Sequence, residues 1–283
     1  MTSMATGSGS DAGALPVPYA VPNLLALERA DRHGSPPGAN DWTRRPSADH
    51  PNPVVLVHST SGNKQGNWQT LAPLLSNEGY TVFALTYGAV PHTPWPIDAI
   101  GGITSMKRSA RQLAAFVDRV LDATGADKVD IVGHSQGALM PNYYVKFLGG
   151  AAKVDKYVSL APLWGGTDLF VTIDLPRWLK GRRTSVVARR VLYGISKACQ
   201  EMRPDSAFLR ELARDGIYSD ALTYTNIVTT LDQVVVPYTS GCVEGPNATT
   251  IVVQDEHPES NVNHLGLMAD PIVARYVVDA LAT

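Results

Sequence analysis

The sequence has few cysteines and no long apolar run. Its 283 residues include two cysteines, Cys199 and Cys242, without the paired Cys or Cys/His spacing of a zinc site. An even count is compatible both with two separate thiols and with a single disulfide. No stretch of 18 or more apolar residues occurs, so neither a membrane-spanning helix nor stable membrane insertion is predicted.

The chain also lacks a strong charge of either sign. Its formal net charge is −2, which gives no reason to expect a nucleic-acid partner. The N-terminus has neither the charged region nor the apolar region of a signal peptide. Residues 1–13 are rich in Ser, Gly, Thr and Ala, which predicts a disordered tail. With 44% hydrophobic residues, the remaining residues 14–283 can form one large domain.

One stretch, residues 128–140, combines an apolar run with a glycine-rich turn. Val129 to Val132 is typical of a buried strand, and Gly133-His134-Ser135-Gln136-Gly137 follows directly, before a helical pattern. Strand, Gly-x-Ser-x-Gly and helix together form a nucleophile elbow, in which a sharp turn exposes the serine hydroxyl. The bare motif also occurs by chance, but its position between strand and helix favours Ser135 as a nucleophile.

Strand and helix patterns alternate along the rest of the chain. Because parallel strands need crossover helices, this order predicts an α/β fold with a mostly parallel central sheet and helices on both faces. The predicted strands are 54–57, 80–86, 129–132, 157–161, 224–230 and 249–254, and the predicted helices are 23–31, 68–79, 103–124, one directly after Ser135, and 271–281. Residues 168–203 do not fit the alternation. We interpret them as a small cap or lid over the carboxyl edge of the sheet, where ligands bind in such folds, rather than as a plain crossing helix.

A serine nucleophile needs a histidine base and a carboxylate that orients it. In this fold the acid and then the histidine follow the serine in the chain. Asp232 directly follows a predicted late strand and is the first choice for the acid, with Asp168 second. His264 lies in a loop before the last helix and is preferred as base over His257, whose backbone is restricted by Pro258.

Small residues also follow the first predicted strand, in the loop that begins at His58. In nucleophile-elbow folds this loop supplies one half of the oxyanion hole, and the amide after the serine, here that of Gln136, supplies the other. Small residues allow the backbone to approach a substrate closely, although a purely structural turn has a similar composition. We expect Ser59, His134, Leu163 and Trp164 to line the substrate pocket.

These motifs resemble those of the secreted actinobacterial triacylglycerol lipases and esterases of the α/β-hydrolase superfamily and, more distantly, fungal lipase B. The resembling stretches are spread along most of the chain and are 36–42, 53–62, 132–150, 224–237 and 263–281. The resemblance implies that Thr60 donates its amide and hydroxyl to the oxyanion, alongside the amide of Gln136. The family usually has His-Gly-Thr where this chain has His58-Ser59-Thr60, so a positive φ there would strain Ser59.

The predicted function is that of a serine carboxylic-ester hydrolase, a lipase or esterase, with Ser135, Asp232 and His264 as its catalytic triad. The substrate would be a small-molecule or lipid ester, no metal or cofactor is required, and the resemblance implies secretion. An acyltransferase or a polyester- or amide-cleaving hydrolase would use the same triad, so these alternatives stay open. A non-catalytic protein of the same fold is disfavoured because all three triad residues are present.

Overall fold

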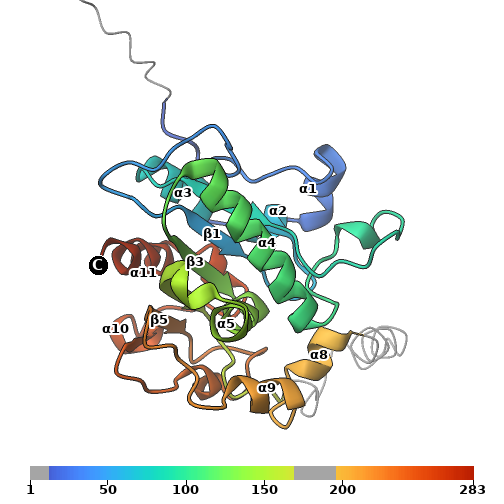
Figure 1. The fold of residues 1–283 in the computed structure, drawn as a ribbon, viewed down its shortest axis with the longest axis vertical. Helices are drawn as coiled ribbons and strands as arrows, with labels where there is room; N and C mark the ends of the chain where they lie inside the picture. The colour runs from blue at the N-terminus through green and yellow to red at the C-terminus, as the bar shows by residue number, and fades with distance from the viewer. Residues whose placement is uncertain (1–12, 169–195) are drawn as a thin grey trace, which may run out of the picture.

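The computed structural model describes residues 13–168 and 196–283, and its centre is a sheet of six parallel strands. The strand order β2-β1-β3-β4-β5-β6 places the elbow strand β3 in the middle (Figure 1). All five strand pairings are parallel, which confirms the predicted α/β class. The strands are β1 (Val54–Val57), β2 (Val82–Leu85), β3 (Val129–His134), β4 (Val154–Leu160), β5 (Thr223–Val228) and β6 (Ala248–Val252).

Helices connect and cover these strands. The α-helices are α1 (Leu24–Ala30), α2 (Lys64–Asn67), α3 (Leu71–Asn77), α4 (Met106–Thr124), α5 (Gln136–Phe147), α8 (Lys197–Glu201), α9 (Ala207–Leu212), α10 (Val253–Glu256) and α11 (Pro271–Ala282). Short 3-10 turns are η1 (Ile97–Ala99), η2 (Gly150–Ala152), η4 (Tyr238–Gly241) and η5 (Gly266–Met268). The chain moves across the sheet in one direction from β1 to β2 and in the opposite direction from β2 to β3 and β4. Because crossovers between parallel strands are right-handed, α3 lies on one face of the sheet and α4 and α5 lie on the other.

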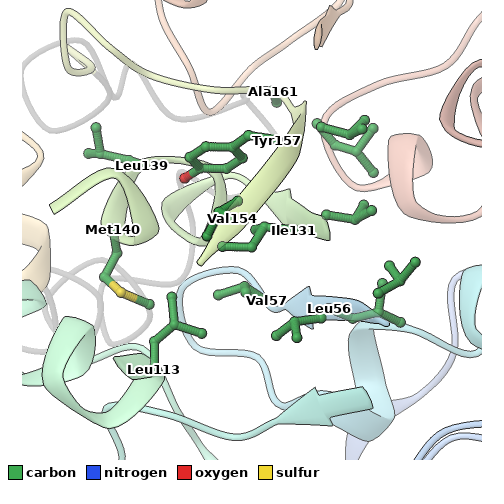
Figure 2. Close-up of a cluster of buried hydrophobic side chains, with 14 of the residues drawn as sticks. Leu56, Val57, Leu113, Ile131, Leu139, Met140, Val154, Tyr157 and Ala161 are labelled. Carbon is green, nitrogen blue, oxygen red and sulfur yellow. The ribbon is translucent and has the colours of Figure 1, made fainter. Parts of the chain in front are cut away.

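The core lies between the sheet and these helices. Figure 2 shows Val57 of β1 and Ile131 of β3 on the face of the sheet that also carries Tyr157 of β4. Leu113 of α4 and Met140 of α5 close this layer from the helix side, and all five side chains are fully buried. Each large apolar side chain buried in this way contributes about 1.5–3 kcal/mol, so the central strands form a rigid support for the loops at their ends.

The long helix α4 receives its N-terminal cap from a distant segment. The Glu201 carboxylate accepts hydrogen bonds from the Met106 backbone N–H at 2.6 Å and from the Ser105 hydroxyl at 3.0 Å. A carboxylate at this position pairs with unsatisfied amides and with the positive end of the helix dipole. The contact fixes α8 against α4 and thereby places Met202, the next residue, beside the loop after β1.

Most element boundaries lie close to the predicted ones, and the differences have local causes. The last strand ends at Val252 instead of residue 254, because the buried Val253 begins the short helix α10. Strand β4 begins three residues earlier than predicted, at Val154, where it pairs with Val129. Cys199 and Cys242 are both free thiols, so no disulfide joins them.

Two predictions fall mainly on residues that are not described. The N-terminal tail is predicted for 1–13, and residues 1–12 lie outside the described ranges. The cap is predicted for 168–203, and 169–195 lie outside them, so the cap and the single-domain division stay predictions. Within 13–168 and 196–283, no helix is both long and apolar enough to cross a bilayer.

Candidate active site

Ser135 occupies the sharp turn between β3 and α5. Its φ of 58° and ψ of −121° place a non-glycine residue in the region normally reserved for glycine. The Ser135 N–H donates to the carbonyl of Leu160 at 2.8 Å, which ties the turn to the end of β4. Such strain persists only where the surrounding structure enforces it, and it is typical of functional sites.

The glycines on either side of this turn are required by close backbone approaches. A Cβ at Gly133 would lie 2.0 Å from the Gly137 carbonyl oxygen, and a Cβ at Gly137 would lie 2.0 Å from the Val57 carbonyl oxygen. Both distances are far inside van der Waals contact with backbone atoms that cannot move aside. Steric crowding therefore requires glycine at both ends of the Gly-x-Ser-x-Gly motif in this chain.

Asp232 and His264 meet beside this turn. The Nδ1 atom of His264 lies 2.8 Å from Oδ2 of Asp232, and the two side chains are only 4% and 2% exposed. The other carboxylate oxygen, Oδ1, accepts the N–H groups of Val234 and Val235, both at 2.8 Å. A carboxylate held in this way can only accept, so Nδ1 carries the proton and Nε2 keeps a free lone pair.

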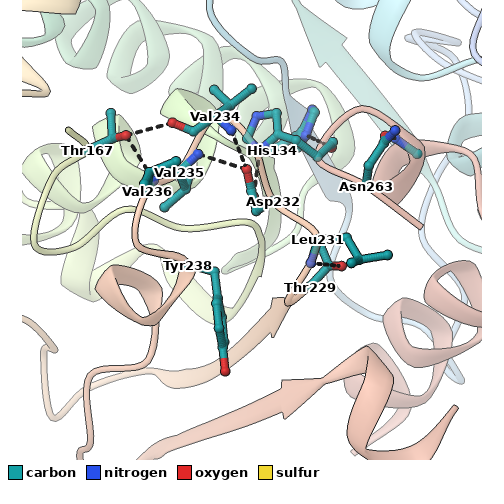
Figure 3. A network of polar contacts seen from close by, with 12 residues as sticks. His134, Thr167, Thr229, Leu231, Asp232, Val234, Val235, Val236, Tyr238 and Asn263 are labelled. Carbon is teal, nitrogen blue, oxygen red and sulfur yellow. Dashed lines mark hydrogen bonds and ion pairs between the residues drawn. The ribbon is translucent and has the colours of Figure 1, made fainter. Parts of the chain in front are cut away.

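Two threonines fasten the loop that carries Asp232 (Figure 3). The Thr167 hydroxyl donates to the carbonyl of Val234 at 2.6 Å and accepts the N–H of Val236 at 3.1 Å. The Thr229 hydroxyl donates to the carbonyl of Val262 at 2.7 Å, two residues before His264. Sequence reasoning missed both threonines, because their partners are 69 and 33 residues away along the chain.

His134 is completely buried and does not reach the surface of a pocket. Its Nε2 lies 3.0 Å from the backbone carbonyl of His264, and the two rings lie 5.0 Å apart between centroids. Since a carbonyl only accepts, Nε2 of His134 carries a proton and supports the backbone of His264. The predicted pocket residue is therefore a support for the histidine loop, and it brings His264 next to the elbow.

Thr60 lies against the first residue of α5. Its hydroxyl donates to Oε1 of Gln136 at 2.7 Å. The Gln136 backbone N–H belongs to the first turn of α5 and has no acceptor within the helix. The two predicted oxyanion residues are thus neighbours, immediately beside Ser135.

The loop that carries Thr60 is fixed by a buried histidine and a buried amide. His58 stacks on Tyr87 with ring centroids 4.2 Å apart, and its Nδ1 lies 2.7 Å from the Ser59 carbonyl. The Ser59 backbone N–H and hydroxyl both donate to Oδ1 of Asn67. Ser59 is half-buried, and its polar groups serve the loop itself. Positive φ occurs at Ser61 (57°) and not at Ser59, so the strain expected at Ser59 is absent.

The remaining predicted residues make other contacts. Leu163 and Trp164 are buried, and the Trp164 indole N–H donates to Asn226 at 3.1 Å within the aromatic core. His257, the second choice for the base, is 37% exposed and faces Glu259 at 3.5 Å. The backbone N–H of Asp168, the second choice for the acid, donates to the Val236 carbonyl.

Acid should destabilise the fold through His58 and His134. Burial, with repulsion from His264 as a second cause, lowers the pKa of His134 to about 3. Burial lowers the pKa of His58 to about 4. Because both folded-state values lie below the unfolded value of about 6.5, their stabilisation is complete above pH 6.5 and is lost as the pH falls. Each histidine should remove about 2 kcal/mol of unfolding free energy between pH 8 and pH 5.

Urea unfolding at pH 8, 6.5 and 5 measures this effect. The His58→Asn and His134→Asn variants each lack one titrating group, so each should show a shallower loss with acid than the wild type, whatever its stability at pH 8. Equal pH slopes in the wild type and both variants would show that the buried histidines are not responsible.

The arrangement supplies the parts of a covalent acyl-transfer site. It has a hydroxyl on a strained turn, an imidazole with a free nitrogen, a carboxylate that fixes the imidazole, and backbone amides beside the hydroxyl. Within the described part of the chain, no group of three or more His, Cys, Asp or Glu side chains is placed to hold a metal ion.

Comparisons with protein families and with curated sequences both match this chain to lipases. The family model described as lipase (class 2) matches residues 51–277. The triacylglycerol lipases of Pseudarthrobacter phenanthrenivorans and Burkholderia plantarii are each 32% identical over 96 residues, which is 32% of this chain and 27% and 24% of those proteins. The match therefore spans about a quarter of the length of these curated relatives.

Solved structures show the same fold at low sequence identity. Aspergillus fumigatus lipase B matches with a TM-score of 0.64 and 16% identity, over 88% of this chain and 56% of that one. The mature Bacillus licheniformis lipase BlEst2 matches with a TM-score of 0.62 and 14% identity, over 88% and 99% of the two chains. The expected α/β-hydrolase fold is thereby confirmed.

Proposed function

Because this chain belongs to the family of class 2 lipases, we propose that it is a serine carboxylic-ester hydrolase that cleaves acyl esters through an acyl-enzyme. The observation that carries the proposal is the buried 2.8 Å contact between His264 and Asp232, next to a serine held at φ 58°. A buried imidazole–carboxylate pair beside a strained serine has no evident structural purpose, whereas it meets the requirements of nucleophilic catalysis.

In the first half of the reaction, Ser135 is acylated. His264 Nε2 accepts the Ser135 hydroxyl proton while Oγ attacks the ester carbonyl carbon, and the carbonyl oxygen becomes negatively charged. The backbone amides of Thr60 and Gln136 and the Thr60 hydroxyl stabilise that oxygen. His264 then returns the proton to the alcohol, which leaves, and the acyl group remains on Ser135.

In the second half, water releases the acid. His264 removes a proton from water, the resulting nucleophile attacks the acyl carbonyl, and the same donors hold the second oxyanion. His264 finally gives the proton back to Ser135 Oγ. Asp232 keeps Nδ1 protonated throughout, so that Nε2 is the nitrogen that exchanges protons. The substrate class is acyl esters, including lipid esters, and secretion remains a prediction from the family resemblance.

A fluorophosphonate probe tests the nucleophile directly. The probe should form a phosphonyl ester with Ser135, seen by mass spectrometry as one modified peptide covering residues 128–140. The same protein should hydrolyse p-nitrophenyl butyrate, and this activity should fall in proportion to the fraction of Ser135 that is labelled.

The matched control is Ser159→Ala, which removes another buried serine hydroxyl, on the neighbouring strand β4. This variant should label as the wild type does. A folded wild-type protein that is not labelled, or is labelled at another residue, would contradict the proposal.

A further inference from the structure

The side chain of Gln136 carries an unexplained feature. Gln136 is fully buried, and its Nε2 is a buried atom that has no hydrogen-bond partner among residues 13–168 and 196–283. Buried amide nitrogens are almost always paired, because leaving the group unpaired forfeits its hydrogen bonds to water. The catalytic cycle proposed above uses only the backbone N–H of this residue and gives its side chain no purpose.

The same side chain controls the proton of the Thr60 hydroxyl. Oε1 of Gln136 accepts that proton at 2.7 Å, and the only other hydrogen-bond partner recorded for the hydroxyl, within the described residues, is the Met202 sulfur at 3.8 Å. A hydroxyl has one proton, so while it donates to Oε1 it cannot donate to an oxyanion. In this arrangement the Thr60 hydroxyl is withheld from the reaction.

A half-turn of the Gln136 amide reverses this situation without displacing the side chain. The amide oxygen and nitrogen have nearly the same size and shape, so their exchange places Nε2 next to Thr60 Oγ1. Nε2 then donates to the hydroxyl oxygen, and the hydroxyl proton is free to point at the oxyanion. The exchange also pairs one of the two N–H groups of Nε2 that are otherwise unpaired.

The residues packed around the Gln136 side chain keep its amide next to the Thr60 hydroxyl, so that a rotation of the amide is the movement left to it. Gly102 packs against it so closely that a Cβ at this position would lie 3.2 Å from Oε1 and 3.1 Å from the Thr60 Cα. The Met202 sulfur covers another side of the Thr60 hydroxyl, and Glu201 fixes Met202 through its cap on α4. The amide and the hydroxyl thus face each other in a confined space.

We propose that the Gln136 side-chain amide is a positioning residue that switches the Thr60 hydroxyl between a withheld state and an oxyanion-donating state. This inference rests on the ester-hydrolase function proposed above and adds a role for a side chain that the elbow motif does not assign. Gln136 acts through Thr60 in this scheme, so removing the Thr60 hydroxyl must remove the effect of the Gln136 side chain.

A double-mutant cycle tests this dependence. Thr60→Val retains the backbone N–H and should lower kcat for p-nitrophenyl butyrate by about 100-fold, since one oxyanion donor is lost. Gln136→Met also retains its backbone N–H and should lower kcat by about 10-fold or more, with KM nearly unchanged, because the hydroxyl loses the group that orients it. In the Thr60→Val background, Gln136→Met should lower kcat no further.

A second substitution tests the direction of the hydrogen bond. Gln136→Glu is nearly isosteric, but its carboxylate can only accept, so it should hold the Thr60 proton permanently and lower kcat more than Gln136→Met does. Thr124→Val, which removes a buried hydroxyl at the far end of α4, is the matched control for the loss of a threonine hydroxyl.

The double-mutant cycle and the fluorophosphonate labelling test the Gln136–Thr60 switch and the hydrolase function separately. Equal effects of Gln136→Met in both backgrounds, or a kcat at or above wild type in Gln136→Met alone, would overturn the switch while fluorophosphonate labelling of Ser135 still supports the hydrolase. Absence of labelling in the wild type would overturn the hydrolase itself. If Gln136→Met does not fold, the Gln136→Glu cycle with Thr60→Val provides the same comparison.

Discussion

Replacing Ser135 with alanine is expected to lower kcat for ester hydrolysis by about 10⁶-fold, the magnitude found when a triad nucleophile is removed. No other described hydroxyl lies on the strained turn beside His264, so no side chain can take over the attack. The Asp232–His264 pair and the backbone amides remain, and they account for any residual rate. Initial rates with p-nitrophenyl butyrate, corrected for the uncatalysed reaction, measure the loss.

The fold should not be the reason for this loss. Alanine retains Cβ, so Ser135→Ala keeps the strain of φ 58° and ψ −121° and should unfold in urea much as the wild type does. Ser135→Gly removes that strain and should be about 1 kcal/mol more stable than Ser135→Ala, while being equally inactive. A Ser135→Ala protein with more than a tenth of the wild-type rate would assign the nucleophile elsewhere.

The sequence predicted the parts of the fold and site that depend on local pattern. The apolar run at 54–57 and the mainly apolar run at 129–132, which includes the buried Asp130, form buried strands because a strand with helices on both sides is buried on both faces. The elbow could be predicted because its glycines are required by contacts within a few residues or with the neighbouring strand. Asp232 and His264 could be placed by chain order, since the ends of parallel strands lie at one edge of the sheet.

The sequence did not reveal what holds these residues in place. Thr167 and Thr229 act on carbonyls in other loops, and no residue pattern near them indicates the partner. The assignment of His134 to a pocket wall followed from its position beside Ser135, but its ring turns into the core and supports His264. The Gln136 Nε2 atom, which has no partner among the described residues, is likewise a consequence of packing, and it becomes visible only when Thr60 and Gly102 are placed around it.

Replacing Asp232 with asparagine is expected to lower kcat by about 10⁴-fold while the loop keeps its shape. Two backbone N–H groups, of Val234 and Val235, point at the Oδ1 position and require an acceptor there. They therefore fix the asparagine oxygen at that position and turn its NH₂ group toward His264 Nδ1. A donor facing Nδ1 forces the imidazole proton onto Nε2, and the ring can no longer accept the Ser135 proton.

Urea unfolding, together with kcat and KM for p-nitrophenyl butyrate, distinguishes a wrong tautomer from a damaged loop. Asp232→Asn should unfold near the wild-type midpoint with KM little changed, whereas Asp232→Ala leaves the two amides unpaired and should lower the unfolding free energy by about 1–3 kcal/mol as well. Asp168→Asn is the matched control, because sequence reasoning placed Asp168 second. If Asp168→Asn gave the large loss and Asp232→Asn less than a tenfold loss, the orienting carboxylate would be Asp168, and the contact of Asp232 with His264 would have to be structural.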